Sequence, residues 1–262
     1  MSSETNAIRW EKHPATDNPL MIAAFEGWND GGTASTNAVR RIIKAIAAEK
    51  FASIDPEEFY VFSDNRPTVK LVDGRSRQIN WQTNDFYCAR LPSADRDVIL
   101  FLGNEPNLNW RNYCANLASV ARHQNVKTVV TLGAYLADVL YTLPVQVTGF
   151  AHNMDIEEKH DLSRSNYEGP TGIVGVLSDY CRQQGLNTLS LWAAVPYYIS
   201  IPNPKAVHAL LTKLNEIFSI EIDLASLEQD ADNFDNEIND VVAKDPNVAA
   251  YVRELKKREF LN

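Results

Sequence analysis

Two carboxylates in one short turn, Glu26 and Asp30, are the first side chains of this chain whose types and spacing could do chemistry. They follow an apolar run at 20–25 that has the length of a buried parallel strand, and a helical pattern begins directly after the turn. Gly27 and Gly31 allow the backbone to approach another group closely, and the N-terminus of the helix presents free N–H groups. As a ligand site, the turn would bind hydroxyls or a metal, or would move a proton.

A structural interpretation of the same turn is preferred to the ligand site. The turn has neither the lysine of a phosphate-binding loop nor the glycine spacing of a dinucleotide fingerprint, and its two carboxylates disfavour a free anion. Asp30 is placed to cap a helix that begins near Thr33, while Trp28 would plug a crevice or contact a partner. We therefore expect mainly a structural or subunit-contact role, with a small-ligand site as the alternative.

Two later strands are predicted to end at comparable glycine-containing turns. The apolar run at 98–102 stops at the turn 103–105, and the run at 127–132 reaches Gly133. Because the carboxyl ends of parallel strands meet at one edge of a sheet, these turns should border a shared crevice. The predicted binding residues are Glu26, Gly27, Trp28, Asn29, Asp30, Gly31, Gly103, Asn104, Glu105, Gly133 and Tyr135.

Other reactive groups are weaker candidates. Metal-ligand side chains are densest between His152 and Asp161, but His152 and His160 lack the i, i+4 spacing of a zinc-binding helix, so this segment is interpreted as a solvated loop. The sequence has no Gly-x-Ser-x-Gly nucleophile elbow, and Cys114 and Cys181 fall on the apolar faces of helical patterns. We predict no catalytic residue, no metal and no cofactor, and leave enzymatic activity undecided.

Composition favours a globular protein of a reducing compartment. Acidic residues outnumber basic ones by 34 to 25, which gives a formal charge of -9 and disfavours nucleic acid and acidic membranes as partners. Three cysteines fit neither a disulfide framework nor a zinc knuckle. The first residues lack the features of a signal peptide, and no stretch reaches the roughly 18 apolar residues of a membrane helix. We expect a cytoplasmic protein.

Three parts are expected along the chain: an N-terminal arm at 1–18, an α/β domain at 19–220 and a C-terminal helical appendage at 221–262. The domain should hold a mostly parallel sheet with helices on both faces, and its first helix should end near Lys50. The pattern then changes to short β-rich pieces, in which Asp73-Gly74 predicts a hairpin that extends the sheet in antiparallel fashion. Strands are expected there at 59–62, 68–71, 78–81 and 86–89.

The C-terminal appendage has its own pattern. Apolar residues at steps of three and four from Leu224 to Val241 predict one helix, and Asp245-Pro246 begins another. The first of these helices is rich in acids and the second in basic residues, which indicates a helical hairpin attached to the α/β domain.

The first turn is also part of a longer motif that resembles a known family. The run from 24 to 32, Ala-Phe-Glu-Gly-Trp-Asn-Asp-Gly-Gly, is similar to the signature of the proteasome assembly chaperone 2 family, in particular its actinobacterial-type members of unassigned function. The similarity extends over roughly the first 220 residues, through 102–106, 131–135 and 194–198. It implies a phosphorylase/hydrolase-like α/β fold and a role in binding or assembly.

The family resemblance also bears on the end of the chain. Members that dock on the proteasome α-ring use a C-terminal hydrophobic-Tyr-x tail. This chain ends in Glu259-Phe260-Leu261-Asn262, without a tyrosine in the penultimate place. Docking on the proteasome through such a tail is therefore not expected.

The favoured function is a non-catalytic binding or assembly protein that acts through interfaces with protein partners. Trp28, Trp81, Tyr197 and Tyr198 are too many aromatic groups for one domain to bury, so we expect a homo-oligomer, with a trimer as the candidate state. The alternative is an enzyme that acts on a nucleoside-like or other small ligand at the carboxyl edge of the sheet, a fold analogy. A third hypothesis is a ligand sensor in which the helical hairpin reports occupancy.

Overall fold

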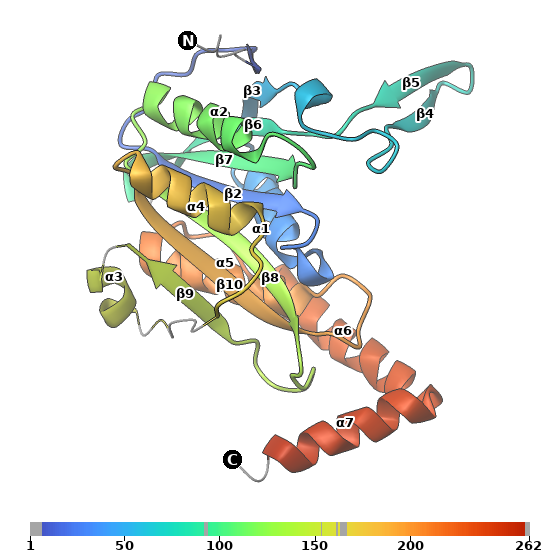
Figure 1. Cartoon of the computed structure of the whole chain (residues 1–262). Helices are drawn as coiled ribbons and strands as arrows, with labels where there is room; N and C mark the ends of the chain where they lie inside the picture. The colour runs from blue at the N-terminus through green and yellow to red at the C-terminus, as the bar shows by residue number, and fades with distance from the viewer. Residues whose placement is uncertain (1–6, 92–93, 153, 161, 163–166, 260–262) are drawn as a thin grey trace.

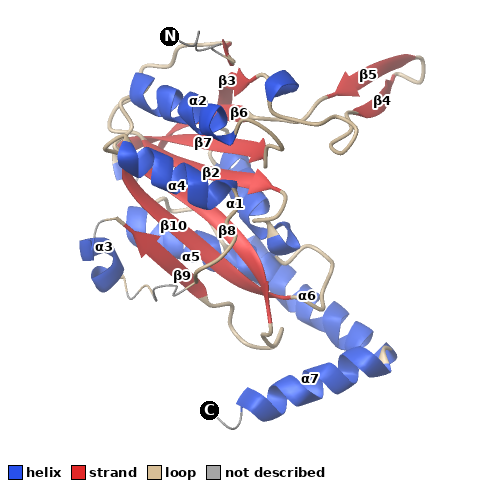
Figure 2. Cartoon of the chain, in the orientation of Figure 1, coloured by secondary structure: helices blue, strands red, loops and turns tan. Residues whose placement is uncertain are grey.

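An eight-stranded mixed sheet forms the centre of the computed structural model, which describes residues 7–91, 94–152, 154–160, 162 and 167–259 (Figures 1 and 2). Asp161 of the expected solvated loop and the tail residues Phe260, Leu261 and Asn262 lie outside the described residues. The strand order across the sheet is β1-β3-β6-β7-β2-β8-β10-β9. The strands are β1 (Ile8–Trp10), β2 (Leu20–Glu26), β3 (Glu49–Ile54), β6 (Asp85–Leu91), β7 (Arg96–Asn104), β8 (Thr128–Ala137), β9 (Val147–Ala151) and β10 (Asn187–Pro196).

The four central strands of this sheet are parallel, and the flanking strands are antiparallel. β7 pairs with β2, β2 with β8, and β8 with β10 in parallel register, so their carboxyl ends share one edge. β1, β3, β6 and β9 run antiparallel to their neighbours. The expected α/β class with a large sheet and C-terminal helices is therefore confirmed, with antiparallel strands on both flanks.

Helices cover both faces of the sheet, and successive side chains of β2 point alternately into the two helical layers. Leu20, Ile22 and Ala24 are buried in the layer that holds α1 (Ala34–Ala45) and α5 (Pro204–Phe218). Their neighbours Met21, Ala23 and Phe25 are buried against α2 (Trp110–His123) and α4 (Ile173–Gln183). A strand buried on both faces has no polar alternation, which is why its sequence is a continuous apolar run.

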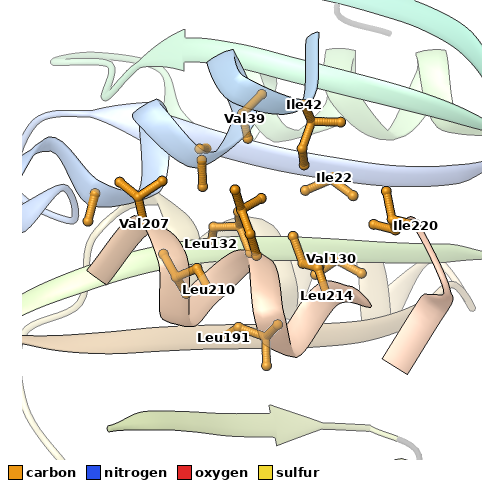
Figure 3. Packing of buried hydrophobic residues seen from close by; sticks show 14 of the residues in the cluster. Ile22, Val39, Ile42, Val130, Leu132, Leu191, Val207, Leu210, Leu214 and Ile220 are labelled. Carbon is orange, nitrogen blue, oxygen red and sulfur yellow. The ribbon is translucent and has the colours of Figure 1, made fainter. Parts of the chain in front are cut away.

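Figure 3 shows the α1–α5 layer from close by. Side chains of the two helices meet those of the central strands, and each large side chain that is fully buried contributes about 1.5–3 kcal/mol to folding. The labelled residues of this layer are Ile22, Val39, Ile42, Val130, Leu132, Leu191, Val207, Leu210, Leu214 and Ile220.

The β-rich segment differs from the expectation in two places. The first helix ends at Ala45 rather than near Lys50, and Glu49–Ile54 forms β3 instead. The strand expected at 59–62 is wrong, because Pro56–Glu58 is a 3-10 turn and Phe59 and Tyr60 are buried side chains of the connection that follows it.

The hairpin predicted at Asp73-Gly74 is present, but it does not extend the main sheet. β4 (Thr68–Val72) and β5 (Ser76–Asn80) pair only with each other among the described strands. Both central turn residues have positive φ, 52° at Asp73 and 68° at Gly74, as a type I′ turn requires. Figures 1 and 2 show this hairpin projecting away from the body. We call residues 66–81 the arm.

The C-terminal residues form the two expected helices, α6 (Ala225–Lys244) and α7 (Pro246–Glu259). The carboxylate of Asp245 caps α7 by accepting from the N–H of Asn247 at 2.8 Å and from that of Val248 at 3.3 Å. Leu227 of α6 belongs to the core layer of α1 and α5, whereas Val241, expected in the buried seam, is 47% exposed.

The charges of these helices are paired differently from the expectation. Asp230 of α6 pairs with Arg41 of α1, and Asp235 pairs with Lys205 of α5 at 3.0 Å. Within the described part of the chain, no ion pair joins α6 to α7. The acidic helix is therefore held electrostatically by the α/β body, and the boundary at 220 between domain and appendage stays a prediction.

Two further features complete the fold. Ile8–Trp10, inside the segment expected as an N-terminal arm, forms edge strand β1 and pairs with β3. Met154–Lys159 forms the short helix α3 between β9 and α4. Of the helices that the structure describes, none combines the length and the apolarity needed to cross a membrane.

Candidate functional site at the carboxyl edge of the sheet

The side chain of Asp30 caps α1, although the residue at the N-cap position is Thr33, three residues later. Its Oδ1 accepts from the backbone N–H of Ser35 at 2.9 Å and of Thr36 at 3.1 Å, and also from the Ser35 hydroxyl at 2.6 Å. Its Oδ2 accepts from the Thr36 hydroxyl at 2.5 Å. The residue is 8% exposed. These four hydrogen bonds use the lone pairs of the carboxylate on the protein's own first helical turn, as expected of a cap.

Glu105 connects three segments that are distant in sequence. Its Oε1 accepts from the side-chain amide of Asn29 and from the backbone N–H of Ile173, both at 2.9 Å. Its Oε2 accepts from the N–H of Trp28 at 3.3 Å. Ile173 is the first residue of α4, so the carboxylate occupies the positive end of that helix. Glu105 thus holds the β2–α1 turn against the start of α4.

Glu26 forms a second, more exposed set of contacts. Its Oε1 pairs with the guanidinium of Arg40, and its Oε2 accepts from the side-chain amide of Asn104 at 3.2 Å. Both side chains of the ion pair are about two-fifths exposed, 44% for Glu26 and 41% for Arg40. Water therefore screens the pair, and its contribution to stability is small.

A buried polar cluster contacts the backbone of Asn104. The hydroxyls of Tyr60 and Tyr113 lie 2.8 and 2.7 Å from Asn84 Oδ1, and both also approach the Asn104 carbonyl oxygen. Burial raises the pKa of Tyr60 to about 12, so this hydroxyl stays protonated at neutral pH. Sequence analysis missed Tyr60 and Asn84, because nothing near either residue in the sequence indicates a contact with the end of β7.

The predicted glycines have packing roles. Gly133 lies inside β8, where the Trp192 ring crosses so closely that a Cβ would come within 2.4 Å of it. Gly103 lies under Phe101 and Tyr113, and Gly31 packs against Val195 and Ala134. These three positions bring strands and rings together and do not line an open crevice.

An open polar pocket of about 560 Å³ remains beside the turn. Four predicted binding residues line it, and the rest come from the residue before the arm, the connection between β7 and α2, and the start of α2. The lining residues are Glu26, Gly27, Asn65, Asn104, Glu105, Pro106, Asn107 and Trp110. Asn29 and Asp30 are not among them. The predicted crevice therefore has two parts. Around Asn29 and Asp30 the polar groups are hydrogen-bonded within the protein, whereas the part beside Glu26 and Asn104 is an open pocket.

Apolar side chains face solvent at the same edge. The exposed fractions are 62% for Trp28, 40% for Tyr135, 59% for Leu136 and 47% for Tyr197. Their backbones are neighbours, because Ala134 N–H donates to Asn29 O at 2.8 Å and Tyr197 N–H to Ala137 O at 3.2 Å. Tyr135 and Leu136 are successive residues of β8 and point to opposite faces of the sheet, so these side chains surround its carboxyl edge. We call Trp28, Tyr135, Leu136 and Tyr197 the carboxyl-edge patch.

The three cysteines are not reactive thiols. All three thiols are free. Burial raises the pKa of Cys88 to about 11 and those of Cys114 and Cys181 to about 12. A thiol with so high a pKa is almost fully protonated at pH 7 and is a poor nucleophile.

A family model was matched by most of the chain. The model of the PAC2 family covers residues 24–242, from the end of β2 through α6. The chain belongs to the PAC2 family. The resemblance drawn from the motif at 24–32 is thereby confirmed.

Solved structures agree with this assignment. A PAC2 family protein from Streptomyces avermitilis is 42% identical with a TM-score of 0.82, over 89% of this chain and 99% of that one. A proteasome-assembly chaperone homologue from Mycobacterium tuberculosis is 41% identical with a TM-score of 0.81 and the same coverage of both chains. An archaeal proteasome activator from Pyrococcus furiosus shares the fold, at 19% identity and a TM-score of 0.74, over 89% of this chain and 97% of that one.

Proposed function

We propose that this PAC2 family chain is a non-catalytic, chaperone-like binding or assembly protein of the cytoplasm that acts through protein interfaces and as a homo-oligomer. The relative from M. tuberculosis is described as a proteasome-assembly chaperone homologue, which supports a protein partner. Three free cysteines with raised pKa values suit a reducing compartment.

The observation that carries this proposal is that the carboxylates at the carboxyl edge are hydrogen-bonded within the protein while an aromatic side chain beside them is exposed. The Asp30 and Glu105 carboxylates, which an enzyme would present to a substrate, are engaged in hydrogen bonds that hold the fold. Trp28, in the same turn, is 62% exposed. Tryptophan is among the residues most enriched at the energetic centres of interfaces, so its exposure favours contact with a protein.

Self-association is tested by sedimentation velocity of the purified chain between about 1 and 100 μM, a range in which interfaces of micromolar affinity assemble. We expect an oligomer, with a trimer as the candidate state. A chain that stays monomeric through this range would contradict the homo-oligomer.

The protein partner is tested separately. We expect the chain to bind isolated proteasome α-subunits, and Trp28→Ser to weaken that binding without lowering the melting temperature. The control is Leu108→Ser, which removes an exposed apolar side chain, 48% accessible, that is not part of the patch. Equal binding by both variants and the parent chain would remove the patch from this function.

The open pocket favours a second candidate, a small-ligand site or an enzyme that acts on a nucleoside-like compound. Glu26 and Asn104 offer acceptors and donors to hydroxyls, and Trp110 offers an aromatic surface. A thermal-shift screen with nucleosides tests it, since a ligand at 100 times its dissociation constant stabilises by about 2.7 kcal/mol. Glu26→Gln should abolish a genuine shift, whereas Glu57→Gln, outside the pocket, should leave it intact.

A further inference from the structure

The arm has one face that is mainly apolar and one that is mainly polar. Val69 and Ile79 are direct cross-strand partners, so they share a face, and Leu71 and Trp81 follow at two-residue steps on that same face. All four are exposed, at 58% for Val69 and Leu71, 51% for Ile79 and 50% for Trp81. Arg77, the cross-strand partner of Leu71, lies on this face as well, and the opposite face carries Thr68, Lys70, Val72, Ser76, Gln78 and Asn80.

A two-stranded hairpin with an exposed apolar face is not expected to be stable by itself. An isolated two-stranded hairpin is marginally stable in water and needs a third strand or a packed face. The body covers only the root, where Trp81 meets Phe62 with ring centroids 4.9 Å apart and Gln82 Nε2 donates to Asn65 O at 2.8 Å. Beyond the root, the apolar face has no cover from its own chain among the described residues.

The net charge of the arm indicates which partner covers its apolar face. The arm contains four cationic residues, Arg66, Lys70, Arg75 and Arg77, against the single acid Asp73, a formal charge of +3. The whole chain carries -9, so all other residues together carry -12. A basic arm is therefore attracted to a second copy of this acidic chain, and oppositely charged surfaces associate faster and in a defined orientation.

The body offers one apolar surface of matching character, the carboxyl-edge patch. Asp138, exposed just beyond Leu136 at the end of β8, adds an acid to its border. The arm leaves the body beside β3 and β6, whereas the patch lies at the ends of β2, β8 and β10, and Figure 1 shows the arm directed away from them. In this arrangement the arm is not directed at the patch of its own chain.

We propose that the apolar face of the arm of one copy docks on the carboxyl-edge patch of a second copy. This inference rests on the proposed homo-oligomer and names its interface. The contact is heterologous, with different surfaces on the two copies, and such contacts close into rings when the rotation permits. Docking would cover the apolar side chains of the hairpin and so supply the packed face that an isolated hairpin lacks.

The experiment compares three full-length variants with the parent chain by sedimentation velocity. The arm variant V69T/L71T/I79T places β-branched threonine, which suits a strand, at three of the four apolar positions of the face. The patch variant W28S/L136S alters the other surface. The control S76T/Q78T changes the arm without touching its apolar face. All replaced side chains are on the surface, so circular dichroism and melting temperature should match those of the parent.

We expect the arm and patch variants each to be monomeric, with a dissociation constant raised about 100-fold or more, and the control to behave as the parent. Mixing the two variants should restore association as a one-to-one dimer, because each retains the surface that the other lacks. High salt should weaken the parent oligomer through screening of the basic arm.

Other outcomes separate the two proposals. An oligomeric arm variant would overturn the arm interface and leave the proposed homo-oligomer standing. A patch variant that still associates, beside a monomeric arm variant, would indicate arm-to-arm pairing and overturn the patch as receptor. A monomeric parent chain would overturn both.

Discussion

The β2–α1 turn and the arm are both short glycine-containing segments, yet they direct their side chains in opposite ways. In the turn, Asp30 is 8% exposed and accepts four hydrogen bonds from the helix that it precedes. In the arm, Val69 and Leu71 are each 58% exposed. The polar groups of the turn hold its own fold and only its Trp28 is left for another surface, while the arm leaves a row of apolar groups for one.

This difference predicts two profiles of substitution. Changes at Asp30 and Glu105 should lower the stability of the isolated chain, because Asp30 caps α1 and Glu105 joins the turn to the start of α4. Changes on the arm should leave stability almost unaltered and should act on association instead, because the arm contributes few contacts to the body.

Glu105→Ala should give the largest effect, a loss of about 3 kcal/mol in the free energy of unfolding. It removes the acceptor for Asn29 Nδ2 and for the first N–H of α4, both bonded at 2.9 Å, and leaves a buried amide without that partner. Urea unfolding followed by circular dichroism measures it. Glu168→Ala, at an exposed position in the loop before α4, is the control and should change stability by less than about 0.5 kcal/mol.

Asp30→Ala should cost about 2 kcal/mol, at the upper end of the range for helix caps, because two hydroxyls lose their acceptor together with two backbone N–H groups. Asp30→Asn keeps one oxygen for the backbone and should cost less. If Asp30→Asn kept the melting temperature of the parent while removing a ligand-induced shift, the turn would be a ligand site, and the comparison with the arm would fail.

Local patterns were enough to predict the cap and the hairpin. Asp before a helix and Asp-Gly between β-rich pieces each act through backbone groups a few residues away, so a short window of sequence contains the whole interaction. The buried strand β2 was equally clear, since a continuous apolar run is the direct consequence of burial on both faces.

Long-range partners were beyond such patterns. Glu105 meets Ile173 across 68 residues, and Tyr60 meets Asn104 across 44. No local periodicity encodes either contact. Gly133 was assigned to a crevice because it follows an apolar run, but β8 continues past it to Ala137 and the Trp192 ring fills the space above it. Whether a glycine ends a strand or admits a ring depends on the neighbouring strand.

Gly74→Ala should affect the arm alone. The residue has a φ of 68° with open space around it, so the substitution strains the backbone by about 1 kcal/mol without a clash. We expect the arm to open independently of the body, so its amides should exchange with solvent about fivefold faster, which is that strain converted to a population. Hydrogen exchange detects this, and amides of β2 should exchange as in the parent. Faster exchange in β2 as well would show that arm and body unfold as one unit.

Ile79→Thr should have the smallest effect on stability and is the sharpest test of the comparison. Ile79 is 51% exposed and its cross-strand partner is Val69, so a β-branched polar replacement removes little buried area and keeps the strand preference. The free energy of unfolding of the monomer should change by less than about 0.5 kcal/mol. Ile22→Thr makes the same chemical change at a fully buried position of β2, where the hydroxyl lies among apolar groups and should cost several times more. If Ile79→Thr destabilised the monomer as much as Ile22→Thr, the apolar face of the arm would already be packed within its own chain, and no partner would be needed to cover it.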